Sequence, residues 1–233
     1  MDKHPRGFLV ARAGALLTEG GLMLDLGAGD GSYWEQFLAE RPRVRYGGVE
    51  IAPARRPLLP NMRIVAGDCT DLATVKAALG GELADLVVSK SAIEHIYPER
   101  RAAFLRTAHE CLSPACTFLL QYDQGHFMCG RWQDLKSAIA RPLHRLRAPR
   151  VQYAKPLDID AYEEVIHRSS FEIVTKHYTG VADIKRLIGA LQTDVRGEAE
   201  RRWVAFEKYA NLTFPEAVLR RHFTGLVWEL RRL

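Results

Sequence analysis

Residues 22–37, LMLDLGAGDGSYWEQF, decide the fold of this chain. An apolar run leads to Asp25, glycine then recurs at positions 27, 29 and 31, and a helical pattern begins at Ser32. Because glycine lacks a Cβ atom, a ligand can lie directly against the backbone of such a turn. In open α/β sheets, nucleotide-like ligands bind where the first strand ends. The stretch therefore predicts a strand, a ligand-binding turn and a helix that Ser32 caps.

The remainder of the chain predicts a single α/β domain. Its 233 residues suffice for one core, and apolar runs alternate with helical patterns, which is typical of βαβ units around a parallel sheet. The expected strands lie near Leu22–Leu26, Tyr46–Ile51, Arg63–Ala66, Ala84–Ser89, Thr117–Tyr122, Phe171–His177 and Leu226–Leu230. The expected helices are a short one before the first strand and Ser32–Glu40, Leu72–Leu79, Glu99–Cys111, Asp158–Ser169, Val181–Ala190 and Glu198–Tyr209.

Composition narrows the class of protein further. The longest stretch without a charged residue, Cys111–Tyr122, is too short to span a bilayer, so we expect no membrane segment and a cytoplasmic location. The N-terminal apolar stretch is interrupted by Arg12, which argues against a signal peptide. The four cysteines form no CxxC pair and no zinc-type spacing with histidine, which is typical of reduced, structural thiols.

Two further acids follow the glycine turn at the ends of predicted strands. Glu50 ends the second strand, twenty-five residues after Asp25, and Asp68 ends the third. A carboxylate can accept both hydroxyl hydrogens of a ribose, and an acid at the next strand end can accept from an adenine amino group. Each acid alone could be a solvated loop residue or a helix cap, but three at successive strand ends favour a nucleoside-binding edge.

The ordered series DLGAGDG, GVEI, AGDCTDL and ADLVVSKSAIEHI resembles the motifs of the class I S-adenosylmethionine-dependent methyltransferases. The resemblance covers residues 22–122 and a helix and strand beyond them. It implies a Rossmann-like, doubly wound sheet of seven strands in the order 3-2-1-4-5-7-6, with the last strand antiparallel. It also implies S-adenosyl-L-methionine as cofactor. The LSPAC segment departs from the family, because Ala115 or Cys116 must take the turn that glycine usually makes before the fifth strand.

The resemblance also assigns parts of the cofactor to individual residues. It places the methionine part at Asp25, Gly27 and Gly29, the ribose at Glu50, the adenine at Asp68 and Cys69, and the sulfonium end beside Ser89. The full set of expected cofactor-binding residues is Asp25, Gly27, Gly29, Glu50, Ile51, Asp68, Cys69 and Ser89.

Methyl transfer from a sulfonium requires an acceptor atom in line behind the methyl carbon, so positioning can supply much of the rate. A base is needed only when the acceptor is a hydroxyl or a protonated amine. The candidates are His126, just past the fifth strand, and His95, after the fourth, although His95 could equally be structural. We expect no metal site, because Ser89 and Asp123–Gln124 stand where catechol-type relatives place metal ligands.

Two insertions carry the information about the acceptor. We expect them at about residues 125–157 and 181–214, covering the carboxyl edge of the sheet as helical caps. Residues 131–155 hold seven Lys or Arg against one acid, a surplus of +6 beside a net charge of +5 for the whole chain. This favours an anionic small-molecule acceptor with a hydroxyl or amine.

Three alternatives stay open at this point. The basic insertion could be a solvated face, and the sequence pI of about 9.1 admits RNA or other nucleic acid as acceptor. The fourth strand nevertheless ends in SKSAIEH and lacks the Asn/Asp-Pro-Pro-aromatic run of adenine and amide methyltransferases. A non-catalytic scaffold that only binds the cofactor is the third alternative. The sequence does not predict an oligomeric state.

Overall fold

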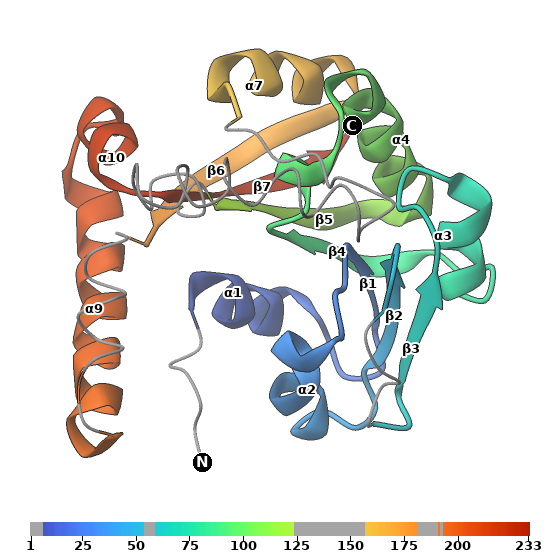
Figure 1. The fold of residues 1–233 in the computed structure, drawn as a ribbon, viewed down its shortest axis with the longest axis horizontal. Coiled ribbons are helices and arrows are strands. Elements are labelled where there is room, and N and C mark those ends of the chain that lie inside the picture. Colours follow the sequence, from blue (N-terminus) through green and yellow to red (C-terminus); the bar gives the residue numbers. More distant parts are fainter. Residues whose placement is uncertain (1–6, 54–58, 124–156, 181–190, 192) are drawn as a thin grey trace, which may run out of the picture.

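The computed structural model describes residues 7–53, 59–123, 157–180, 191 and 193–233. Its centre is a seven-stranded sheet in the order β3-β2-β1-β4-β5-β7-β6 (Figure 1). The predicted strand order and Rossmann-like fold are therefore confirmed. Strands β1 to β5 pair in parallel, whereas β7 runs antiparallel to both β5 and β6. The strands are β1 (Leu22–Leu26), β2 (Arg45–Glu50), β3 (Met62–Ala66), β4 (Ala84–Lys90), β5 (Leu112–Asp123), β6 (Phe171–Thr179) and β7 (Gly225–Arg232).

Helices cover both faces of this sheet (Figure 1). Helices α1 (Phe8–Leu16) and α2 (Ser32–Ala39) pack on one face, in a cluster that includes Trp34 and Met23. Helices α3 (Leu72–Ala78), α4 (Arg101–Cys111) and α7 (Ile159–Arg168) pack on the other, with Phe104 and Leu24 in their cluster. Successive strand residues supply opposite faces, so Met23 and Leu24 belong to different clusters. Burial on both faces explains the near-continuous apolar strands.

Helix α1 is held to strands β6 and β7 by two contacts. Two guanidinium nitrogens of Arg12, Nε and Nη2, each donate to the carboxylate of Glu229 on β7 at 2.7 Å. The ring of Phe8 stacks on His177 of β6 at a centroid distance of 3.7 Å. Burial lowers the pKa of His177 to about 4, so this ring is neutral at physiological pH. Helix α1 is thereby fixed to β6 and β7, the last two strands of the chain.

Two local predictions from the sequence, the turn before the fifth strand and the cap of the first βα helix, can be compared with the structure. Ala115 takes the turn at the start of β5, with φ 61° where glycine was expected, and the β4–β5 register shifts between Ala84 and Leu86. Ser32 does not cap α2, so that prediction was wrong. Gly31 is the N-cap residue, and the Asp30 carboxylate accepts hydrogen bonds from the Ser32 N–H and hydroxyl.

Two helices, α9 (Thr193–Thr213) and α10 (Glu216–His222), stand at the end of the sheet where β6 finishes (Figure 1). Helix α9 is longer than the predicted Glu198–Tyr209, and α10 was not predicted. Glu207 of α9 is buried and accepts hydrogen bonds from the Gly180 N–H, the Thr179 hydroxyl and the Trp203 indole, which joins α9 to the end of β6. The expected helix at Val181–Ala190 lies outside the described residues.

Candidate functional site

The glycine turn after β1 has the backbone that its sequence requires. Gly27, Gly29 and Gly31 adopt φ values of 85°, 57° and 77°, which side chains rarely tolerate. A Cβ atom on Gly27 would lie 2.4 Å from the Ala92 side chain, and one on Gly31 would lie 2.9 Å from Ile64. Gly29 differs, since a Cβ atom added there would have no neighbouring atom within 4 Å. Packing thus explains two glycines, and the third turns a bare backbone toward open space, as a bound ligand needs.

Asp25 lies beneath this turn as a buried carboxyl that is half satisfied. Its side chain is 3% exposed, and its Oδ2 accepts a hydrogen bond from the Tyr46 hydroxyl at 2.8 Å. Its Oδ1 has no hydrogen-bond partner among the described residues. Burial raises the pKa of Asp25 to about 6, although the bond from Tyr46 and the nearby Trp34 indole oppose the rise. A buried acceptor without a donor is costly unless a ligand supplies one.

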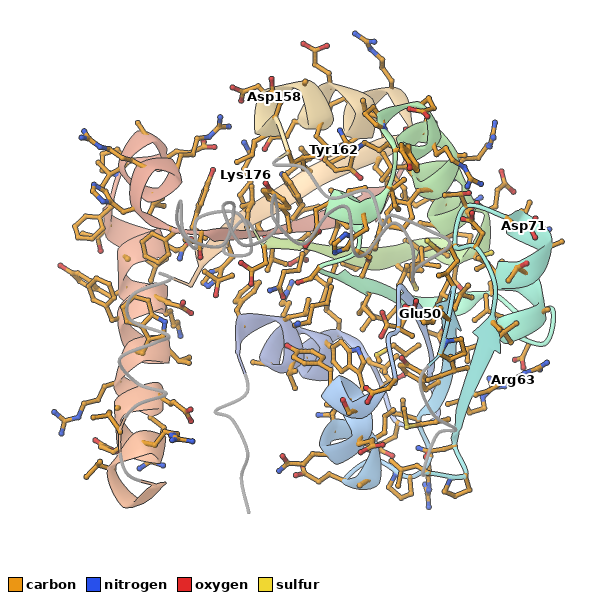
Figure 2. The ribbon with its side chains drawn as sticks, viewed as in Figure 1. Glu50, Arg63, Asp71, Asp158, Tyr162 and Lys176 are labelled. Atoms are coloured by element: carbon orange, nitrogen blue, oxygen red, sulfur yellow. The ribbon has the colours of Figure 1, made fainter. Side chains whose placement is uncertain are left out.

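Glu50 ends β2 directly beside the glycine turn (Figure 2). Its carboxylate accepts hydrogen bonds from the Gly29 N–H at 3.0 Å and the Ala52 N–H at 3.4 Å. Each oxygen keeps a free lone pair, so the half-buried side chain can still accept from a ligand hydroxyl. Ile51 follows it with 61% of its surface exposed, an apolar side chain at the rim of the same edge.

Asp68 lies after β3 and is more fully engaged than the sequence suggested. Its Oδ1 accepts from the Thr70 N–H and hydroxyl, and its Oδ2 pairs with Arg100 at 2.6 Å. Burial opposes ionisation here, but these bonds and the Arg100 charge outweigh it and lower the pKa of Asp68. Arg100 was not among the predicted site residues. Burial and the Asp68 charge raise the pKa of the neighbouring Cys69 thiol to about 12, so it is not a nucleophile.

The end of β4 is tied to the glycine turn at two points. The fully buried Ser89 donates its hydroxyl hydrogen to the Leu26 carbonyl at 2.7 Å, so that hydroxyl is committed to joining β4 and β1. Ser91 adopts φ 52°, a conformation uncommon for residues other than glycine, while its N–H donates to the Gln121 carbonyl of β5. The next residue, Ala92, is the one that packs against Gly27. The strained turn therefore brings the segment after β4 against the site.

That segment contains one site residue that the sequence reasoning missed, Glu94. It lies with His95 in the short 3₁₀ helix Ile93–His95. Glu94 is 0% exposed, whereas the predicted base His95 is only half-buried. Neither carboxyl oxygen of Glu94 has a hydrogen-bond partner among the described residues. The signal available in the sequence was an acid framed by apolar residues in SAIEHI.

Both insertions begin at this same edge of the sheet. Asp123 at the carboxyl end of β5 lies in register with Gly225, which also pairs with Thr179 at the end of β6. The first insertion returns at Leu157, whose N–H donates to the Tyr122 hydroxyl at 2.7 Å. The predicted base His126 and residues 131–155 lie outside the described residues. The described residues that flank the two insertions therefore lie at one edge of the sheet, the edge at which β5 and β6 end.

Membrane-spanning helices and clustered metal ligands are both absent from the residues that the structure describes. No helix in the described ranges is long and apolar enough to cross a membrane. No group of three or more His, Cys, Asp and Glu side chains in those ranges could hold a metal ion.

Comparison with known proteins places the fold. Residues 24–118 match the family model described as a methyltransferase domain, while no curated protein matches the chain. Cyclopropane synthase MmaA2 from Mycobacterium tuberculosis is 20% identical, with a TM-score of 0.56 over 95% of this chain and 82% of that one. A TehB-like SAM-dependent methyltransferase from Corynebacterium glutamicum is 14% identical, with a TM-score of 0.59 over 99% and 90%. Mycolic acid cyclopropane synthase CmaA1, solved with SAH and CTAB, is 18% identical, with a TM-score of 0.56 over 96% and 83%.

Proposed function

We propose a reaction for this chain from the premise that it is a class I S-adenosylmethionine-dependent methyltransferase, the family of its matched domain and of its fold. The proposed reaction transfers the methyl group to a hydroxyl or amine of a small, anionic acceptor. The observation that supports this acceptor is the surplus of basic residues in the first insertion, whose flanking residues Asp123 and Leu157 lie at the carboxyl edge of the sheet.

The described residues fit the cofactor at three places. The Asp25 Oδ1, which has no partner among the described residues, can accept a hydrogen bond from the amino group of the methionine part. The open space at Gly29 leaves room for the methionine part itself. Glu50 keeps lone pairs for the ribose hydroxyls, and the exposed Ile51 can cover a face of the adenine. Asp68 can reach the adenine edge only with lone pairs that Thr70 and Arg100 leave free. Ser89 contributes by holding β4 to β1.

The chemistry asks little of the protein beyond this placement. When bound, the cofactor supplies a methyl group already activated by the positive sulfur. The chain holds the acceptor in line and excludes water, which can account for much of the rate. For a hydroxyl acceptor it must also take up one proton, a task that the sequence assigned to His126 or His95.

The anionic acceptor rests on charge and on topology together. Seven basic residues with one acid in residues 131–155 would create a positive potential wherever that segment lies. The described residues that flank this insertion, Asp123 and Leu157, both lie at the carboxyl end of β5, where the Leu157 N–H donates to the Tyr122 hydroxyl. A phosphorylated sugar, a nucleotide-linked sugar or a carboxylate-bearing metabolite would suit this edge. The solved neighbours act on different acceptors, since they include cyclopropane synthases and the mitomycin 7-O-methyltransferase MmcR, and do not distinguish these classes.

The proposal is tested with methyl-labelled cofactor and a panel of acceptors from these three classes. Charge reversal of Arg145 and Arg147 should raise the Michaelis constant for the preferred acceptor at least tenfold and leave cofactor affinity unchanged. The matched control reverses Arg106 on α4 and Arg168 on α7, two exposed residues outside both insertions. This control changes the net charge equally and should leave the Michaelis constant unchanged.

Binding of a mixed-sequence RNA to the same variants separates the nucleic-acid alternative. A nucleic-acid enzyme would lose RNA affinity in the Arg145 and Arg147 variant, and its binding would depend less steeply on salt. Normal acceptor kinetics combined with lost RNA binding would overturn the proposed acceptor. Cofactor binding without transfer to any acceptor or RNA would instead identify a binding scaffold.

A further inference from the structure

We infer that Glu94 is the group that accepts the acceptor's proton during methyl transfer, and that its ionisation is coupled to the charge of the bound cofactor. This inference deepens the proposed function and rests on its hydroxyl or amine acceptor. It also replaces both histidines as the expected base.

Position is the first argument. Glu94 lies in the turn whose strained Ser91 bonds to β5 and whose Ala92 packs against Gly27 of the glycine turn. The side chain therefore lies where β1, β4 and β5 end, next to the cofactor edge and the ends of the first insertion. Methyl transfer requires the acceptor on the far side of the methyl carbon from sulfur, and this junction borders that space.

The second argument is the unsatisfied carboxyl. A fully buried carboxylate without a hydrogen-bond donor is among the costliest groups a protein can hold, and natural structures seldom keep one without a use. Its own backbone N–H lies close enough to lower its pKa but does not form a hydrogen bond of normal geometry. No described residue donates such a bond to either oxygen, so this part of the chain leaves both open to a substrate.

The charged and titratable groups around Glu94 come from both neighbouring strands. Asp123 and Tyr122 lie on β5, and Lys90 ends β4. Burial, chiefly, and then the Asp123 charge raise the pKa of Glu94 to about 7, while Lys90 opposes the rise. Lys90 gives limited help because its ammonium lies 4.7 Å from the centroid of the Tyr33 ring and also acts on Asp25. A cationic ligand at this edge would therefore lower the pKa of Glu94.

The charge balance of the reaction fits this arrangement. A positive sulfur beside Glu94 favours the carboxylate, which releases its proton when the cofactor binds. In the transfer step, a lone pair of the acceptor oxygen or nitrogen forms the bond to the methyl carbon. The electron pair of the broken carbon–sulfur bond stays on sulfur, and the acceptor's proton passes to a Glu94 Oε. The product site then holds a neutral thioether and a neutral carboxylic acid, so no charge is left unbalanced in the buried space.

Calorimetry without any acceptor tests the coupling directly. Binding of S-adenosylmethionine is measured at pH 7 in two buffers of different ionisation enthalpy, and binding of S-adenosylhomocysteine, which lacks the sulfonium charge, is measured likewise. Because its pKa is raised to about 7, Glu94 should release a measurable fraction of a proton when S-adenosylmethionine binds and almost none when S-adenosylhomocysteine binds. Glu94→Gln should abolish that difference while both molecules still bind.

A control variant assigns the proton to Glu94. Glu99→Gln removes an exposed carboxylate five residues away and should change nothing. An unchanged proton release in Glu94→Gln, or its loss in Glu99→Gln, would overturn the inference.

Turnover with the acceptor found by the labelled-cofactor panel tests the base. Glu94→Gln should lower turnover by about 10²–10⁴ with an unchanged affinity for S-adenosylhomocysteine, and Glu94→Asp should restore part of the turnover. If the role of Glu94 were merely structural, Glu94→Gln would instead lower the melting temperature and leave the pH profile of turnover unaltered. Should the acceptor panel fail altogether, the calorimetric result still decides the coupling, so the two proposals can fail separately.

Discussion

Single residues at the carboxyl edge decide which ligand the site can take. Glu50 is the clearest case, because one side chain both braces the Gly29 N–H and faces the ligand edge. Asp25 and Glu94 are two other buried carboxyls of the site, and burial raises the pKa of each. Unoccupied, the site therefore holds acids that a cationic ligand would help to ionise.

Replacing Glu50 by Ala should weaken cofactor binding at least tenfold. The change removes two charge-assisted hydrogen bonds to the ribose, each worth about 1.5–3 kcal/mol when buried, and also the brace on Gly29. Titration calorimetry with S-adenosylhomocysteine measures the loss. Glu50→Gln is the matched control, because it keeps an acceptor oxygen for Gly29 and should lose less. An unaltered dissociation constant in Glu50→Ala would mean that another residue holds the ribose.

At the scale of elements, helix α1 is held by an ion pair that joins distant parts of the sequence. Glu229 is 4% exposed, and besides Arg12 its only other described side-chain donor is the Thr175 hydroxyl, at 3.5 Å. The pair thus covers a charge that the sheet would otherwise leave buried. Helix α9 is attached differently, through the buried Glu207 and the end of β6. Helix α10 is attached through Glu216, which accepts a hydrogen bond from the Tyr178 hydroxyl of β6.

Arg12→Ala should lower the free energy of unfolding by about 1–3 kcal/mol, because it leaves the Glu229 carboxylate buried and nearly unpaired. Denaturant unfolding at neutral pH measures the change. Adding Glu229→Gln should recover part of the loss, since an amide costs less to bury than a charge. Arg45→Ala serves as control, because Arg45 and Glu82 are both about half exposed, and it should cost less than about 1 kcal/mol. Equal losses in the two single variants would show that the Arg12 pair is only a surface contact.

At the scale of the whole molecule, ligand binding and stability are linked. The cofactor residues come from β1, β2 and β3 and the loops after them, so a ligand that holds them together stabilises the native sheet. S-adenosylhomocysteine at a hundred times its dissociation constant should add about 2.7 kcal/mol to the free energy of unfolding. For a chain of this size that corresponds to a rise of roughly 5–10 °C in melting temperature. Differential scanning calorimetry should show this rise with S-adenosylhomocysteine and none with NAD, whereas the reverse pattern would contradict the cofactor.

Much of the fold and of the cofactor edge follows from local signals in the sequence. Glycines at positions 27, 29 and 31 impose a turn that few other residues can adopt, and apolar runs bracketed by helical patterns specify parallel strands. Glu50 and Asp68 could be placed because a strand end is set by the strand itself. These features depend on neighbours within a few residues, so one sequence sufficed to predict them. The strand order is not local and was predicted only through the family resemblance.

Only the tertiary structure decided which polar groups are buried and with whom they pair. Arg12 and Glu229 are 217 residues apart, and nothing near either residue announces the other. Arg100 pairs with Asp68, which lies 32 residues earlier in the chain. Glu94 and His95 are adjacent in the chain, yet the 3₁₀ turn buries the acid completely and leaves the imidazole half-exposed. Local sequence sets backbone conformation, whereas the desolvation and pairing of a charge depend on every chain segment that packs around it.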